Sequence, residues 1–230
     1  MPNSLVNLFK ILLILFIPVI LVIGSIRLLV TDGYLAREYG KTSFPDDPYG
    51  FDRDRRLVYA TANFRYVREN QPLEVLADQK SGEAALYNPR ELKHMQDVQK
   101  VYQSAWRAWQ LALGLSVLAG LVMVWSGDTH TALASALKWG GLLSAGLIVV
   151  IGLLAVLAWR LWFVAFHRIF FASGTWVFNT SDTLIRLFPE KFWFDAALTI
   201  SGLTLGAGLV VTLIGLVWGS REKIQYAKIG

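Results

Sequence analysis

The sequence of 230 residues contains no cysteine, and this absence removes several kinds of chemistry at once. Without a thiol, the chain can form no disulfide, no thiolate metal site and no cysteine nucleophile. It also cannot itself be a lipoprotein anchored through a modified cysteine. No serine stands in a nucleophile-elbow pattern either, which argues against a serine nucleophile of that type.

The chain also lacks a concentration of positive charge, although its formal net charge is +5. Residues 31–104 hold 11 basic and 12 acidic side chains, which gives 11 − 12 = −1. The positive excess therefore lies in the apolar part of the chain and its short tails. No basic patch of the kind that binds nucleic acid is present, so nucleic acid is excluded as a partner.

Apolar residues are abundant and clustered. They make up 54% of the sequence, and the mean hydropathy is +0.44, too high for an ordinary soluble domain. Nine Trp and thirteen Phe add aromatic side chains of the kind that collect at membrane interfaces. The composition therefore predicts an integral membrane protein.

Four apolar stretches are long enough to cross a hydrocarbon core of about 30 Å, which takes roughly 20 helical residues. We expect an all-α membrane protein with transmembrane helices at 1–30, 105–126, 137–163 and 196–218. Glycines in the third and fourth helices favour close helix–helix packing. The span interiors offer almost no ionisable groups, which argues against a transporter.

The first stretch could instead be a cleaved signal peptide. Its apolar run exceeds the usual length of such a segment, however, and no A-x-A-like cleavage site follows. We therefore interpret it as a retained anchor.

Charges beside the spans predict the orientation. The tail at 219–230 carries three basic residues and one acidic residue, so it should be cytoplasmic. With four spans the N-terminus and the connection at 127–136 are cytoplasmic too. The segments 31–104 and 164–195 then lie on the extracytoplasmic face.

The outer segment 31–104 has the turn and helix signals of a small folded cap. Its clearest signal is a helix start, with Asn88 as N-cap, Pro89 at the first helical position and Glu91 completing a near capping box. Nothing in the sequence breaks a helix between Pro89 and Trp125. We expect one continuous helix whose inner part is the second span.

The second outer segment, 164–195, mixes many aromatic residues with a few charged ones. This mixture is typical of a chain that lies in the membrane interface. It could also line a groove for an acyl chain, and the two readings are compatible.

Two of the three histidines should lie on the same side of the membrane. His94 precedes the second span and His167 follows the third, so an even number of crossings separates them in either orientation. His130 falls on the opposite side and is excluded from a shared site. Asp97, three residues after His94 on one helix face, could fix its tautomer.

The heights of the two histidines are harder to match. His94 stands twelve residues before Trp106, which is about 18 Å of helix. His167 stands only four residues after Phe163. The two meet if the segment 164–195 rises, or if the hydrocarbon boundary lies higher on the second span.

Short motifs lie around the two histidines and through both outer segments. They are Phe44-Pro45-Asp46, Tyr49-Gly50-Phe51 with the following Asp-Arg pair, Asn63, Tyr66, His94-Met95-Gln96-Asp97-Val98, Phe166-His167, Trp176, Asp182-Thr183-Leu184-Ile185 and Leu187-Phe188-Pro189. In these motifs, and in the number and order of its spans, the sequence resembles the lipoprotein intramolecular transacylases, a family of small four-span bacterial membrane proteins. Residues 72–85 match nothing recognisable.

The resemblance implies an acyltransferase of the bacterial cell membrane that needs neither a metal nor another cofactor. Its partners would be bacterial lipoproteins and membrane lipid. The substrate would carry a diacylglyceryl group on its N-terminal cysteine, and the sn-2 acyl chain would move to the α-amine of that cysteine. An amine that attacks an ester needs a base and a donor for the developing oxyanion, while the substrate supplies the nucleophile.

The resemblance also suggests roles for particular residues. One of His94 and His167 would be the base and the other the acid or oxyanion donor. Asp97 would orient His94, and Arg55 or Arg56 would organise the cap. The matching motifs add Asp182 and Trp176 as supporting residues of the site.

Two other functions remain open at this point. A metal-dependent lipid hydrolase could use His94 and His167 with Asp97 or Asp182, although the sequence has no H-E-x-x-H pattern. A non-enzymatic scaffold or accessory protein could use its cap to bind a partner. A chelator would inactivate the first, and the second would tolerate loss of both histidines.

Overall fold

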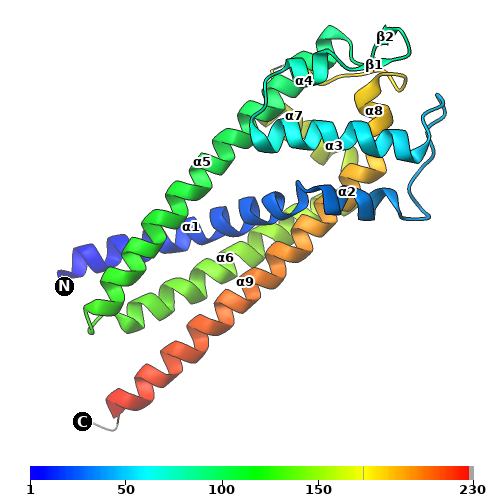
Figure 1. Ribbon diagram of the computed structural model, residues 1–230. Helices are drawn as coiled ribbons and strands as arrows, with labels where there is room; N and C mark the ends of the chain where they lie inside the picture. Colours follow the sequence, from blue (N-terminus) through cyan, green and yellow to red (C-terminus); the bar gives the residue numbers. More distant parts are fainter. Residues whose placement is uncertain (173, 228–230) are drawn as a thin grey trace. The chain divides into compact units, whose positions relative to one another are not determined.

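The computed structural model describes residues 1–172 and 174–227, with side chains up to residue 222. Helices dominate this part of the chain, and the two short strands form one antiparallel hairpin (Figure 1). In order the elements are α1 Asn3–Leu29, α2 Asp32–Tyr39, α3 Arg53–Glu69, α4 Glu74–Ala77, β1 Lys80–Ser81, β2 Ala84–Ala85, α5 Pro89–Trp125, α6 His130–Leu157, α7 Trp159–Phe170, α8 Thr183–Leu187 and α9 Glu190–Ala227.

The chain forms two compact units. The membrane unit comprises Met1–Ile26, Arg107–Leu153 and the chain from Thr199, and the cap unit comprises Arg27–Trp106 and Leu154–Leu198. Both outer segments expected from the sequence therefore belong to one compact unit. That unit holds His94 and His167.

Four helices are long and apolar enough to cross a membrane: α1, α5, α6 and α9. The prediction of four spans is confirmed. The helix α5 runs without interruption from Pro89 to Trp125, as expected. Its first part lies in the cap unit, and the apolar remainder lies in the membrane unit.

The third span differs from the helix expected over 137–163. The helix α6 begins at His130, so most of the expected loop at 127–136 is helical, and it ends at Leu157. Ala158 leaves the helical region, with φ −142° and ψ 49°, and α7 then begins. Neither Pro nor Gly marks this break. Trp159 packs edge-on against Phe194 at 5.3 Å between ring centroids, so aromatic packing within the cap unit accompanies the change.

The fourth helix, α9, is longer at both ends than the expected 196–218. It begins at Glu190, directly after Pro189, and Gly219 and Ser220 do not stop it. Both residues are tolerated because the helix ladder continues, and the Ser220 hydroxyl donates to the Leu216 carbonyl. The end of the expected cytoplasmic tail, 228–230, lies outside the described residues.

The start of α5 confirms the predicted capping box. Asn88 Oδ1 accepts the N–H of Glu91 at 3.0 Å, and Glu91 Oε2 accepts the N–H of Asn88 at 2.8 Å. The second oxygen, Glu91 Oε1, accepts the N–H of Leu184 in α8 at 2.7 Å. One carboxylate, only 1% exposed, therefore satisfies backbone donors at the starts of two helices.

In the membrane unit, glycines bring α6 and α9 into backbone contact. A side chain at Gly141 would collide with the Gly208 carbonyl and the Thr212 backbone, and one at Gly215 would collide with Lys138 and the Ala134 carbonyl. Small residues permit such close approach between helices in membranes. By contrast, a side chain at Gly146 would meet open space.

Replacing Gly141 with Leu should therefore destabilise the protein, because the backbone of α9 cannot rotate away from an added side chain. We expect a cost of about 3 kcal/mol or more, at the upper end for overpacking. Thermal unfolding of the purified protein in detergent would measure it. Gly146→Leu, in the same helix, is the control and should unfold like the unmodified protein. Equal behaviour of the two variants would contradict the packing role of Gly141.

Candidate active site

The rings of His94 and His167 lie close together in the cap unit. Their centroids are 6.3 Å apart with an interplanar angle of 21°, and each residue is 9% exposed. His94 comes from the second turn of α5 and His167 from the last turn of α7. The two rings meet within the cap unit, where α7 is a separate helix that begins after the break at Ala158.

Aromatic side chains enclose the pair. Phe171 and Phe178 meet the His94 ring edge-on, at 4.9 Å and 5.4 Å between centroids. Around His167 stand Phe163 at 4.1 Å and Trp176 at 4.9 Å. The two imidazoles therefore sit in apolar surroundings, where hydrogen bonds to a developing charge are stronger than in water.

A backbone hydrogen bond fixes the tautomer of His167. Its Nδ1 lies 2.7 Å from the carbonyl oxygen of Phe163. A carbonyl has no proton to give, so Nδ1 must carry the hydrogen and donate it. In neutral His167 the lone pair is consequently on Nε2, which is the nitrogen available as a base.

Burial keeps both imidazoles neutral. The expected span begins near Trp106, so His94 lies outside it, and its pKa is lowered to about 4, first by burial and then by the proximity of His167. The pKa of His167 is also lowered by burial, but the hydrogen bond to Phe163 opposes that shift. Of the two histidines, His167 is therefore the one whose protonated form is more favoured.

Asp97 is not hydrogen-bonded to His94. Its Oδ1 accepts from Lys93 at 3.1 Å and lies 3.8 Å from Lys100. The Nδ1 of His94 is buried and has no hydrogen-bond partner among the described residues. Asp97 therefore acts on His94 only through space, by favouring its charged form.

Asp182 fastens the aromatic segment to the start of α5. Its oxygens accept from the Asn88 amide at 3.2 Å, from Arg90 at 3.4 Å and from the backbone N–H of Asn179 at 2.8 Å. The guanidinium of Arg90 also lies over the Phe178 ring, 5.6 Å from its centroid. These bonds place Phe178 against His94.

The two arginines proposed for the cap differ in position. Arg55 is exposed, and its backbone N–H donates to the N-cap Asp52. Arg56 is 1% exposed, donates to the Pro45 carbonyl at 2.6 Å and lies over the Phe44 ring at 4.8 Å. Of the two, Arg56 holds the Phe44-Pro45 turn.

A search against family models matches residues 11–193 to the lipoprotein intramolecular transacylases. The chain belongs to this family. The members are acyltransferases that act on lipoproteins in the membrane, and the recognition made from the sequence is confirmed.

Relatives and solved structures extend this result. An uncharacterised protein of Aquifex aeolicus (strain VF5) is 29% identical over 213 residues, 92% of this chain and 94% of that protein. The structure of the transacylase Lit from Bacillus cereus has a TM-score of 0.78 at 16% identity and covers 96% of this chain and 99% of its own. A histidine-to-arginine variant of that enzyme gives 0.72, also at 16% identity, with 97% and 96% covered. At this identity the structures show a shared fold.

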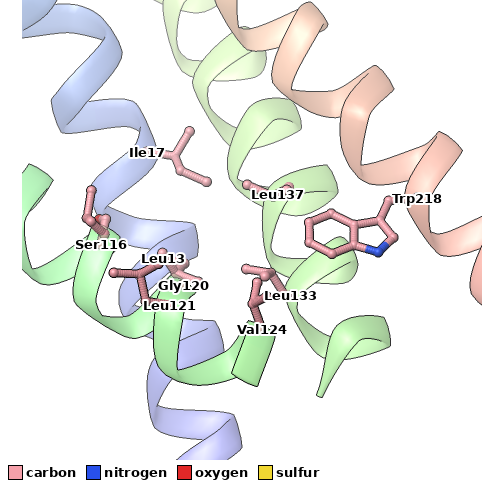
Figure 2. Close-up of a pocket in the computed structure, with 10 residues that line it drawn as sticks. Leu13, Ile17, Ser116, Gly120, Leu121, Val124, Leu133, Leu137 and Trp218 are labelled. Carbon is pink, nitrogen blue, oxygen red and sulfur yellow. The ribbon is translucent and has the colours of Figure 1, made fainter. Parts of the chain in front are cut away.

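An apolar pocket of about 360 Å³ lies in the membrane unit of this transacylase, and the histidine pair does not line it (Figure 2). Side chains from α1, α5, α6 and α9 form it, and no titratable group is among them: Leu13, Ile17, Ser116, Val117, Gly120, Leu121, Val124, Leu133, Leu137 and Trp218. It offers nothing for acid–base chemistry. Among the side chains that the structure describes, no group of three or more His, Cys, Asp or Glu is arranged to hold a metal ion.

The sequence did not indicate that Phe171 and Phe178 contact His94. For Glu91 it predicted the capping box but not the hydrogen bond from Leu184. The segment 164–195 contains so many aromatic residues that no pattern distinguishes the two that contact His94. No local signal connects Glu91 with Leu184, because the contact spans 93 residues of sequence.

Removing the Asp182 carboxylate should loosen the segment that covers His94. In Asp182→Ala, three hydrogen bonds disappear and the Asn179 amide loses its acceptor. We expect faster hydrogen–deuterium exchange in the peptide around residues 174–182. Asp78→Ala, at an exposed aspartate of α4's C-cap, is the control and should leave exchange unchanged. Identical exchange in both variants would show that Asp182 does not hold this segment.

The lowered pKa of His94 predicts that its imidazole remains neutral at pH 5.5, where an ordinary histidine would be protonated. Nitrogen NMR of histidine-labelled protein in micelles, with His94→Asn for assignment, measures this directly. As the pH falls from 6.5 to about 4, the unfolded chain takes up a proton that folded His94 refuses, so His94 makes stability fall over this range. A His94 titration midpoint above pH 6 would contradict this.

Proposed function

We propose that this transacylase moves the sn-2 acyl chain of a diacylglyceryl-cysteine lipoprotein to the α-amine of the same cysteine, giving a lyso-form lipoprotein. The observation that carries the proposal is the pair of neutral imidazoles, 6.3 Å apart in an aromatic enclosure. A substrate with its own amine nucleophile needs a base and a hydrogen-bond donor, and no Ser or Cys of the enzyme. Holding both ends of one molecule together supplies much of the rate by proximity.

The hydrogen bond from His167 to Phe163 favours His167 as the base. Its Nε2 lone pair takes the proton from the attacking amine, and the Phe163 carbonyl stabilises the resulting imidazolium through Nδ1–H. His94 has the more strongly penalised charged form, so it stays neutral and donates an N–H to the oxyanion. Mutual repulsion keeps the two from being charged together.

The orientation completes the proposal. Basic residues of the C-terminal tail favour cytoplasmic termini, so the cap unit and the histidine pair face the extracytoplasmic side of the bacterial cell membrane. Lipoproteins with a lipid-modified N-terminus are exposed to an enzyme on that side. The exposed apolar face of α7, which includes Leu161 and Ile169, then lies in the membrane interface.

Replacing His94 or His167 with Asn should lower transacylation by about 10²–10⁴-fold, the usual contribution of a positioned acid or base. His130→Asn is the matched control, because His130 lies in the membrane unit and contacts Glu222 and the Val124 carbonyl. All three variants should remain in the membrane. Full transacylation activity of both site variants would overturn the assignment of the two histidines as the base and the oxyanion donor.

The product requires a selective assay, because intramolecular transfer leaves the mass of the lipoprotein unchanged. Mild alkali removes both ester-linked chains from the substrate but spares the amide-linked chain of the product. Mass spectrometry of the alkali-treated N-terminal peptide therefore separates the two. Adding a chelator tests the alternative of a metal-dependent hydrolase, which would lose activity and would release free fatty acid.

A further inference from the structure

Trp176 carries a polar group that the fold leaves unpaired. Its indole Nε1 is shielded from solvent and has no hydrogen-bond partner among the described residues. His94 Nδ1 in the same aromatic enclosure is in the same state. A buried donor left unpaired costs about 1–3 kcal/mol, and nearly all buried polar groups in proteins are paired. Two such groups lie in this one aromatic cluster beside the proposed base, where polar atoms of a substrate would pair with them.

Both unpaired groups belong to rings that surround His167. The Trp176 ring lies 4.9 Å from the His167 ring and is tilted by 37°, and the His94 ring lies 6.3 Å away. Phe171 contacts both histidines, at 4.9 Å from His94 and 5.5 Å from His167. The unpaired indole N–H is thus part of the wall that encloses the proposed base.

We propose that Trp176 is a further catalytic residue, whose indole N–H donates a hydrogen bond to the carbonyl oxygen of the migrating ester. This inference rests on the proposed function. An indole is a donor only, so it cannot act as the base, but it suits an oxygen on which negative charge develops. The aromatic surroundings exclude water, which increases the strength of such a bond.

The reaction balances with the residues named. The amine nitrogen forms a bond to the ester carbonyl carbon, the π pair becomes a lone pair on the carbonyl oxygen, and His167 Nε2 takes a proton from nitrogen. Trp176 and His94 donate to that oxyanion. The carbonyl then re-forms as the bond to the glyceryl oxygen breaks, and His167 returns the proton to the leaving oxygen. No oxidant, reductant or second substrate is required.

Trp176→Phe tests the role, because phenylalanine retains an aromatic ring beside His167 and lacks the N–H. We expect kcat to fall by about 10²–10³-fold, the usual cost of one oxyanion donor, with KM little changed. The control is Trp193→Phe, at a tryptophan of the cap unit that is 41% exposed and packs on Phe188 and Phe192. It should retain full activity.

A second replacement separates the hydrogen bond from the packing. Incorporation of benzothienylalanine at position 176 keeps the bicyclic shape and removes only the N–H. Loss of kcat with this analogue supports the proposal even if Trp176→Phe folds poorly. Activity within about twofold of the unmodified enzyme would overturn it and would show that the indole pairs with water only. If the unmodified enzyme forms no alkali-stable N-acyl product, the proposed function itself fails, and this role fails with it.

Discussion

The geometry of the cap depends on the Glu91 carboxylate, which is buried and accepts backbone hydrogen bonds from two helices. One oxygen closes the capping box of α5, and the other holds Leu184 at the start of α8. Burying a carboxylate costs free energy unless hydrogen-bond donors surround it. The bonds from the two helix starts reduce this cost, and at the same time they hold the two helices together. Because α8 follows the segment that carries Trp176 and Phe178, fixing α8 against α5 fixes where that segment can run.

Asp182 forms further hydrogen bonds between the start of α5 and the aromatic segment. It joins Asn88 and Arg90 of the α5 start to the end of the aromatic segment, while Phe178 lies between Arg90 and His94. The polar residues therefore act on the histidines indirectly, by positioning aromatic rings. Those rings bury both imidazoles, and the burial lowers both pKa values and so favours the neutral rings. A hydrogen bond in such apolar surroundings is stronger than in water.

Local signals explain which features the sequence could predict. Span length depends on composition alone, so the four apolar helices were predicted correctly, and the capping box at Asn88 and Glu91 was recognisable because its partners are three residues apart. The break at Ala158 was not recognisable, since neither Pro nor Gly stands there. The packing of Trp159 on Phe194 accompanies the break, and because Phe194 is 35 residues away in sequence, no local pattern indicates this contact.

Composition alone establishes a four-span membrane protein, and the parity of crossings then requires that His94 and His167 share a side. The sequence also carried enough of the family's motifs to identify a lipoprotein transacylase. Folding was needed to show that the two rings lie 6.3 Å apart, that Phe163 fixes the tautomer of His167, and that Arg56 is buried while Arg55 is exposed. The difference is physical: span count and sidedness follow from local composition, whereas ring contacts and proton positions depend on residues brought together by folding.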